Sequence, residues 1–160
     1  YMSTPIGNVT IIENLNIVVY IGLPDLKQDD ILNWCKNKLN YNRISKIDNP
    51  QSIAKTQIEE YFSGQRKVFD FKYQLFSTQF RKKVLNAVMD IPYGQTKSYG
   101  EIAKVIGHPK AMRAVGTANA TNTLPIFIPC HRVIAKNGGL GGYGGGLDIK
   151  IKLLELEGWI

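Results

Sequence analysis

The first 22 residues combine short β-branched runs with polar breaks. Two such runs, residues 9–12 and 17–22, are separated by the four residues 13–16. β-Branched side chains favour extended backbone, and a short polar break between two such runs is typical of a hairpin. The pattern therefore predicts an antiparallel β-hairpin.

Two stretches with helical spacing of apolar residues follow this hairpin. Residues 29–39 are expected to form a helix capped by Asp29 or Asp30, and residues 53–62 a second helix ended by Gly64. No cluster of polar residues in this half indicates chemistry. We therefore expect it to have a structural role.

The second half has a mostly helical pattern. After a connector with a short extended piece, apolar spacing predicts helices over residues 78–91, 98–106, 108–120 and 148–157. Ser98 and Glu101 have the spacing of a capping box, and Asp148 is expected to cap the last helix. Gly107 ends the second of these helices, and Pro109 suits the first turn of the third. Two short helices joined by such a turn make a helix-turn-helix.

Residues 124–134 form a short apolar run that contains a cysteine, a histidine and an arginine in direct succession, Cys130 to Arg132. A run of this length is typical of a buried extended segment. Pro125 and Pro129 exclude both a regular helix and a central sheet strand. Pro129 also restricts the backbone just before Cys130, so the sulfur is held in a stiff frame.

Cys130 has two interpretations. A free cysteine in an apolar run is often an inert part of the core. However, a cation from His131 or Arg132 would favour the reactive thiolate, and neither cation can be buried cheaply without a partner. Adjacent side chains on an extended segment point to opposite faces, so either the chain turns at Cys130 or a water carries the proton to His131. A third group should orient the imidazole.

Charge is distributed unevenly along the chain. The formal net charge is +7, and residues 75–160 hold 11 Lys and Arg against 5 Asp and Glu, whereas residues 1–74 hold 9 against 8. A basic second half indicates a polyanionic partner for that half, although a well-solvated surface would also explain it.

Cysteine content and hydropathy predict a cytoplasmic location. Cys35 and Cys130 are the two cysteines of the chain, which is too few for a disulfide framework or a Cys-rich zinc site. Cys35 lies on the apolar face of the predicted helix 29–39, where inert core is the better interpretation. No stretch is long and apolar enough to span a membrane, and no secretory signal is recognisable.

Residues 128–133, Ile-Pro-Cys-His-Arg-Val, resemble the active-site motif of the O6-alkylguanine-DNA alkyltransferases, also called methylated-DNA–cysteine methyltransferases. The resemblance extends from about Phe80 to Trp159 and is weaker in the first third. It implies an α+β fold with two domains. Residues 1–74 would form a small antiparallel β-sheet/helix domain of RNase H-like type, and residues 75–160 a mostly helical domain with a winged-helix-like helix-turn-helix.

The resemblance also implies a catalytic group. Cys130 would accept the alkyl group, His131 would keep it deprotonated through a water, and Glu157 would polarise His131. Tyr99 would help to rotate the target nucleotide out of the duplex and would hydrogen-bond the guanine, although a half-buried aromatic at a helix start is the plainer interpretation. Neither a cofactor nor a metal ion is implied.

Double-stranded DNA is the partner that the resemblance implies, bound by a monomer through the minor groove. Arg113 matches an arginine that fills the space left by a flipped alkylated guanine, although a phosphate contact or an ion pair would also explain it. Asn122 would tie the DNA-binding helix to the active-site segment. Small side chains on that helix suit a narrow groove or a packed core equally well: Ala111, Ala114, Gly116 and Thr117.

A glycine-rich stretch, residues 138–146, contains a formal G-x-G-x-x-G pattern. No βαβ unit follows it, so a dinucleotide site is excluded. The resemblance implies instead a loop that lines the substrate pocket, with Tyr143 over the alkyl group. Many relatives carry Ser where this chain has Gly144, so a wider pocket is expected. The implied substrate-binding residues are Val133, Tyr143, Gly144, Gly145 and Lys150.

The expected function is direct, single-use repair of O6-alkylguanine, and possible activity on O4-alkylthymine is left open. Three alternatives compete with it. A non-catalytic lesion sensor would lack the cysteine. A Cys–His hydrolase is disfavoured because Cys130 and His131 are adjacent. A transcription regulator would leave Cys130 and the glycine-rich loop without a purpose.

Overall fold

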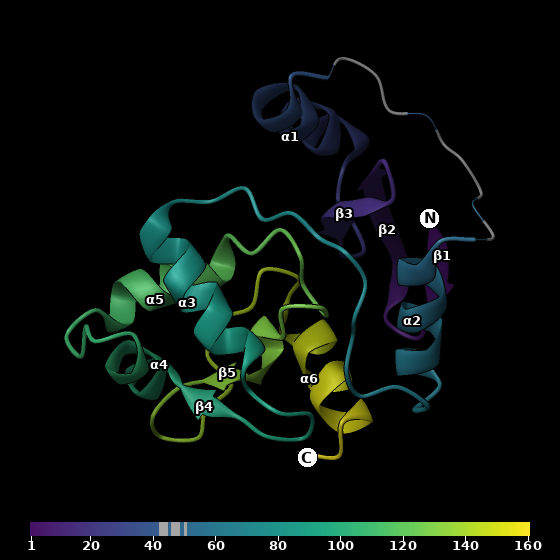
Figure 1. The fold of residues 1–160 in the computed structure, drawn as a ribbon. Coiled ribbons are helices and arrows are strands. Elements are labelled where there is room, and N and C mark those ends of the chain that lie inside the picture. The colour runs from purple at the N-terminus through teal and green to yellow at the C-terminus, as the bar shows by residue number, and fades with distance from the viewer. Residues whose placement is uncertain (42–44, 46–48, 50) are drawn as a thin grey trace.

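The computed structural model describes residues 1–41, 45, 49 and 51–160. Its elements are β1 (Met2–Thr4), β2 (Gly7–Asn14), β3 (Ile17–Gly22), α1 (Gln28–Leu39), α2 (Ile53–Phe62), α3 (Gln79–Met89), β4 (Lys97–Ser98), α4 (Tyr99–Val105), α5 (Met112–Ala120), the 3-10 helix η1 (Cys130–Arg132), β5 (Val133–Ile134) and α6 (Leu147–Leu156). A small sheet and a group of helices lie side by side (Figure 1). The α+β class is confirmed.

Strands β1, β2 and β3 form one antiparallel sheet in that order. The predicted hairpin is β2–β3, with a register shift between Ile12 and Glu13. Its turn is tight because Leu15 and Asn16 both have left-handed backbone, with φ of 50° and 64°, which matches the twist of the two strands. The pattern did not indicate β1. The connector bridges β3 in parallel through Val18 and Tyr73, which confirms its short extended piece.

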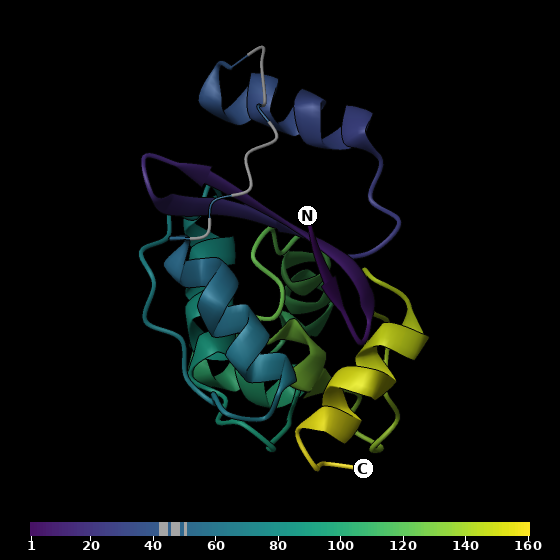
Figure 2. The same cartoon turned by 90° about the vertical axis from the view of Figure 1, so that its right-hand side faces the viewer.

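The sheet has buried residues on both faces. Helix α1 covers one face, while α2 and the second half of the chain lie on the other (Figure 2). Cys35 of α1 packs with Ile12 and Val19 of the sheet in a small cluster. The larger cluster joins residues from both halves of the chain, among them Ile58 and Leu153, so the two halves share one core.

Several helix boundaries agree with the sequence. Thr78 caps α3 and accepts from the backbone N–H of Arg81 at 3.4 Å. Ser98 and Glu101 form the predicted capping box at the start of α4. Gly64, in left-handed backbone at φ 76°, follows the end of α2.

Three predicted helix starts are wrong. Helix α1 begins at Gln28 after Lys27 and has no side-chain cap. Asp29 and Asp30 therefore lie in the first turn, where acidic side chains interact favourably with the helix dipole. Helix α6 likewise begins at Leu147, before Asp148, and also lacks a side-chain cap. Helix α5 begins at Met112 and not at residue 108.

The late start of α5 has a local cause. The N–H of Ala111 donates to the carbonyl of His108 at 2.8 Å, which closes a turn over the residues that were expected to be helical. Within the described residues, no helix is long and apolar enough to cross a bilayer.

Candidate active site

The chain turns at Cys130. Residues Cys130–Arg132 form a single 3-10 turn, in which the N–H of Arg132 donates to the carbonyl of Pro129 at 2.9 Å. The turn that the sequence left open as one alternative at Cys130 is therefore observed. The expectation of an extended segment is wrong for most of residues 124–134, because Ile126 has a left-handed backbone and the N–H of Ile128 bonds back to Leu124.

Strand β5 fixes the end of this segment. Val133 and Ile134 pair in parallel with Lys97 and Ser98 of β4, directly before α4. On the other side of Cys130, Asn119 of α5 donates to the Cys130 carbonyl at 3.1 Å. The 3-10 turn Cys130–Arg132, hereafter the reactive turn, is therefore fastened to both helices of the helix-turn-helix, α4 and α5.

Asn122 connects the end of α5 to the same segment. Its amide Nδ2 donates to the carbonyl of Ile128 at 2.9 Å, and its Oδ1 accepts from the N–H of Leu124 at 2.9 Å. Asn119 acts in a similar way from inside the helix, but sequence reasoning missed it. An asparagine within a helical pattern carries no local signal for such a contact.

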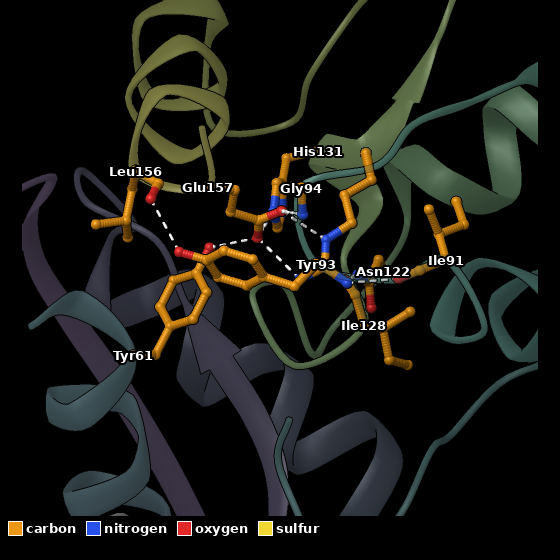
Figure 3. Close-up of polar contacts among 10 residues, drawn as sticks. Tyr61, Ile91, Tyr93, Gly94, Asn122, Ile128, His131, Leu156 and Glu157 are labelled. Atoms are coloured by element: carbon orange, nitrogen blue, oxygen red, sulfur yellow. Dashed lines mark hydrogen bonds and ion pairs between the residues drawn. The ribbon is translucent and has the colours of Figure 1, made fainter. Parts of the chain in front are cut away.

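The Glu157 carboxylate lies next to the reactive turn and accepts hydrogen bonds from several elements (Figure 3). His131 donates through Nε2 to Glu157 Oε1 at 2.8 Å. Arg132 binds the carboxylate with two nitrogens, each at 2.8 Å. The N–H of Gly94 and the hydroxyl of Tyr61 complete the set at 3.1 and 2.7 Å. All five donors meet on one buried carboxylate at the end of α6.

Sequence reasoning found His131 and Glu157 but not the other donors. Arg132 was noted only as a cation that needs a partner. Tyr61 and Gly94 are 96 and 63 residues from Glu157, and no local pattern links such distant positions. The first half of the chain therefore does more than was expected, since Tyr61 contacts Glu157 directly.

The electrostatics of the pair favour a neutral imidazole beside an ionised carboxylate. Burial raises the pKa of Glu157, but hydrogen bonds from His131 and Arg132 outweigh it and bring the pKa down to about 2. Burial lowers the pKa of His131, against the opposing effect of Glu157. A neutral His131 that donates through Nε2 has Nδ1 as its acceptor. Among the described residues, no protein group bonds to Nδ1.

Opposing effects act on the pKa of the Cys130 thiol, and burial is the largest of them. Burial raises the pKa of the Cys130 thiol, whereas Asn122, Tyr143 and the Lys150 ammonium act in the opposite direction. Burial lowers the pKa of Lys150 to about 8. Its ammonium donates to the carbonyls of Val133 and Leu140, so Lys150 also fastens β5 to the glycine-rich loop.

Cys130 opens onto a pocket of about 350 Å³. Tyr143, Gly144 and Gly145 line this pocket from the glycine-rich loop, as does Asn122 from the end of α5. The first half of the chain also lines the pocket, through residues 20, 21 and 23–26. A Cβ at Gly145 would lie 2.5 Å from the end of the Leu23 side chain, so a side chain at position 145 would have to displace Leu23.

Tyr99 begins α4 beside the glycine-rich loop. Its hydroxyl donates to the carbonyl of Gly142 at 3.4 Å, and its ring lies 3.8 Å from where a Cβ on Gly116 would be. Tyr99 is therefore held between the loop and α5. The side chain is half-buried, as expected for an aromatic residue at a helix start.

Helix α5 presents small side chains to solvent. Arg113, Ala114 and Thr117 are exposed, and Ala111 and Gly116 are partly exposed. Val115 and Ala118 make the buried face. Small residues on the exposed face do not serve the core, so the packed-helix interpretation does not explain them.

No metal centre is visible in the part of the chain that the structure describes, because no three His, Cys, Asp or Glu side chains gather there as ligands would. The site instead combines a thiol, an imidazole and a carboxylate. This set can activate a nucleophile without a bound ion.

Comparison with known proteins gives consistent matches. Residues 79–159 match the family model of the 6-O-methylguanine DNA methyltransferase DNA-binding domain. A constitutive methylated-DNA–protein-cysteine methyltransferase of Bacillus subtilis is 43% identical, over 97% of this chain and 92% of its own. A methylated-DNA–protein-cysteine methyltransferase of Methanosarcina acetivorans is 58% identical over 105 residues, which cover 66% of this chain and 67% of the length of that protein.

A solved structure is similar over nearly the whole chain. The crystal structure of Mycobacterium tuberculosis OGT in complex with DNA is 38% identical, with a TM-score of 0.80, over 98% of this chain and 89% of that one. The match covers both halves of the chain, including the first half, where the motif carries no information. The chain belongs to the methylated-DNA–protein-cysteine methyltransferase family.

Proposed function

We propose that this chain repairs O6-alkylguanine in DNA by irreversible transfer of the alkyl group to Cys130. The observation that carries this proposal is the pocket of about 350 Å³ that contains Cys130, with His131 and Glu157 in hydrogen-bond contact behind it at 2.8 Å. The methylated-DNA–protein-cysteine methyltransferase of Bacillus subtilis, whose name states this activity, matches this chain over 92% of its own length.

The residues have distinct roles in the transfer. Glu157 holds His131 with its proton on Nε2, so Nδ1 can take the thiol proton of Cys130, directly or through a water. The thiolate attacks the alkyl carbon, a C–S bond forms and the C–O6 bond breaks. The electron pair passes to the guanine, which takes up a proton. Tyr99 is proposed to offset the negative charge as the guanine leaves.

The thioether product explains why the protein should act once. A thioether is stable, and the described part of the site offers no group placed to hydrolyse it. Lys150, whose pKa is about 8, favours the thiolate, because its ammonium lies close enough to oppose the effect of burial on Cys130. Val133, Tyr143, Gly144 and Gly145 are proposed to hold the purine and its alkyl group.

DNA is proposed to lie along the exposed face of α5. Guanine O6 is inside the duplex, so the base must leave the stack, at a cost of a few kcal/mol. The small exposed residues of α5 would let the backbone approach a narrow groove, and we propose the minor groove. Arg113 is exposed on that face and is proposed to fill the space of the flipped nucleotide. Asn122 would keep the DNA-bound helix and the reactive turn in register.

We also propose a domain boundary, an oligomeric state and a cellular location for the chain. A boundary near residue 75 falls between α2 and α3 and separates a near-neutral part of the chain from a basic DNA-binding part. One copy holds Cys130, His131 and Glu157 together, so a monomer can act. A DNA substrate and a reactive thiol both favour a location in the cytoplasm.

Intact-mass measurement tests the proposal. The chain is incubated with a duplex that contains O6-methylguanine, and peptide mapping locates any added methyl group. We expect one methyl group per chain, on Cys130. Cys130→Ala should bind the duplex and gain no mass, and Cys35→Ala is the matched control that should react fully. Binding without mass gain by the unmodified chain would indicate a lesion sensor, and turnover beyond one equivalent a hydrolase.

A further inference from the structure

Tyr61 of α2 is buried next to the catalytic carboxylate (Figure 3). Its side chain is fully inaccessible to solvent, and its hydroxyl donates to Glu157 Oε1 at 2.7 Å. The same oxygen accepts from His131 Nε2 at 2.8 Å. A residue from the first half of the chain therefore shares one acceptor atom with the imidazole.

We propose that Tyr61 is a positioning residue for alkyl transfer, which holds Glu157 in the orientation that directs His131 toward Cys130. The proposal rests on the catalytic roles proposed above for these three residues. Neither the sequence motif nor the family resemblance assigns a role to Tyr61.

Packing alone accounts for the ring of Tyr61 but not for its hydroxyl. The ring contacts Phe62, Phe69 and Tyr93, with centroid separations of 5.3, 5.5 and 6.1 Å. A phenylalanine would make the same three contacts. A buried hydroxyl is costly unless it is bonded, and here its partner is the carboxylate on which the proposed mechanism depends.

The hydroxyl remains a donor throughout the working pH range. Burial, followed by the negative charge of Glu157, raises the pKa of Tyr61, so the phenol stays protonated. Glu157 Oε1 accepts from Tyr61, His131 and Arg132. Arg132 contacts both oxygens, so it fixes the carboxylate as a whole, whereas Tyr61 acts only on the oxygen that His131 uses.

Loss of this donor has a predictable electrostatic direction. Without the Tyr61 hydroxyl, the charge on Oε1 is less dispersed and attracts a protonated His131 more strongly. The pKa of His131 should therefore rise. His131 must be neutral to accept the proton of Cys130, so the acidic limb of the rate profile should move to higher pH.

Tyr93 provides a matched control. Its hydroxyl donates to the backbone carbonyl of Leu156 at 2.9 Å, next to Glu157 but not on the carboxylate. Tyr93→Phe and Tyr61→Phe each remove one tyrosine hydroxyl from the same region. A purely structural effect should appear in both variants, and an effect through Oε1 only in Tyr61→Phe.

The experiment measures the rate of transfer from free O6-benzylguanine between about pH 5 and pH 9, because this substrate does not require DNA binding. Tyr61→Phe should react about tenfold more slowly near neutral pH, the equivalent of one lost hydrogen bond, with its acidic limb displaced to higher pH. Tyr93→Phe should keep the unmodified profile. Replacement of Tyr61 by 3-fluorotyrosine, a stronger donor that preserves the packing, should displace the limb to lower pH.

An unchanged profile for Tyr61→Phe, or equal slowing of both phenylalanine variants without a displaced limb, would overturn the proposal. If Tyr61→Phe fails to fold, the fluorotyrosine protein alone decides, and an undisplaced limb would overturn it. Failure of the proposed function would look different, because the unmodified chain would then gain no alkyl group on Cys130.

Discussion

Glu157 shows how much one residue can depend on distant parts of a chain. Five donors from Tyr61, Gly94, His131 and Arg132 meet on its two oxygens. The pair with Arg132 balances a buried guanidinium, which also donates to the carbonyl of Ile91 at 2.5 Å. Removal of the carboxylate charge should therefore affect both stability and reactivity.

We predict that Glu157→Gln lowers the free energy of unfolding by about 3 kcal/mol at pH 7, which corresponds to a pKa displaced from 4.5 to about 2. Because the folded pKa is depressed, this contribution is complete above pH 4.5 and is lost as the pH falls toward 2. Urea unfolding at pH 7 and pH 3 should show the gap between variant and unmodified chain narrowing at the lower pH.

Glu60 supplies the control for that measurement. It pairs with Arg66 at the surface, where both side chains are partly exposed, and such pairs contribute about 0–1 kcal/mol. Glu60→Gln should therefore change stability little at either pH. A Glu157→Gln loss that is equally small, or one that does not depend on pH, would contradict the buried-charge account.

Arg113 gives a second prediction at this scale. Arg113→Ala should slow transfer from duplex DNA by about 10- to 100-fold, because the cost of base extrusion is a few kcal/mol. Transfer from free O6-benzylguanine should be unchanged, since no base has to be extruded. Single-turnover rates on both substrates provide the measurement. Equal losses on the two would exclude the role in extrusion.

The sequence revealed those site residues that lie in a recognisable local pattern. Cys130 and His131 are adjacent in a motif, whereas Glu157 was assigned a role only through the family resemblance. Tyr61 and Gly94 contact the same site only because the fold brings their elements together. A single sequence has no signal for such long-range contacts, so they could not be predicted.

Elements were predicted best where apolar spacing and a capping residue agree. Helix α4 has both, and its capping box is observed as expected. Helix α5 has only Pro109 and Lys110 to mark its start, and the chain forms a turn there before Met112. The segment around Cys130 was expected to be extended, but two prolines exclude regular structure without specifying which turns replace it.

The exposed face of α5 leads to a prediction about Gly116. A Cβ there would lie 3.8 Å from Tyr99, an ordinary contact, so Gly116→Ala should raise stability by about 0.5–1 kcal/mol through helix propensity. If DNA lies against this face, the added methyl group should nevertheless weaken duplex binding. Thermal unfolding and fluorescence anisotropy measure the two effects.

Gly100 of α4 serves as the control. A Cβ at Gly100 would meet Met112 at 3.5 Å, so Gly100→Ala should stabilise the protein similarly but leave duplex affinity close to that of the unmodified chain. If Gly116→Ala binds DNA as tightly as Gly100→Ala, close approach of α5 to the groove is wrong.

At the scale of the whole molecule, the two halves differ in charge but not in their contribution to the site. Residues 75–160 carry most of the net positive charge of +7, and composition was enough to show this. The pocket lining by residues 20, 21 and 23–26 and the shared core could not be inferred from it, because composition contains no information about which surfaces meet.

The charge distribution predicts where salt should act. Lys104 is exposed on α4, and Lys110 is exposed in the segment between α4 and α5. Lys36 and Lys38 are exposed on α1. If the helix-turn-helix contacts phosphates, Lys104→Gln and Lys110→Gln should each reduce the slope of log affinity against log salt by about 1, through loss of counterion release. The double variant Lys36→Gln/Lys38→Gln removes as much charge from α1 as those two variants remove together, and it should leave the slope unchanged. Anisotropy titrations of an unmodified duplex from about 50 to 300 mM salt would decide. A reduced slope for the α1 variant would place the DNA along the first half of the chain and overturn the proposed assignment of the DNA-binding face.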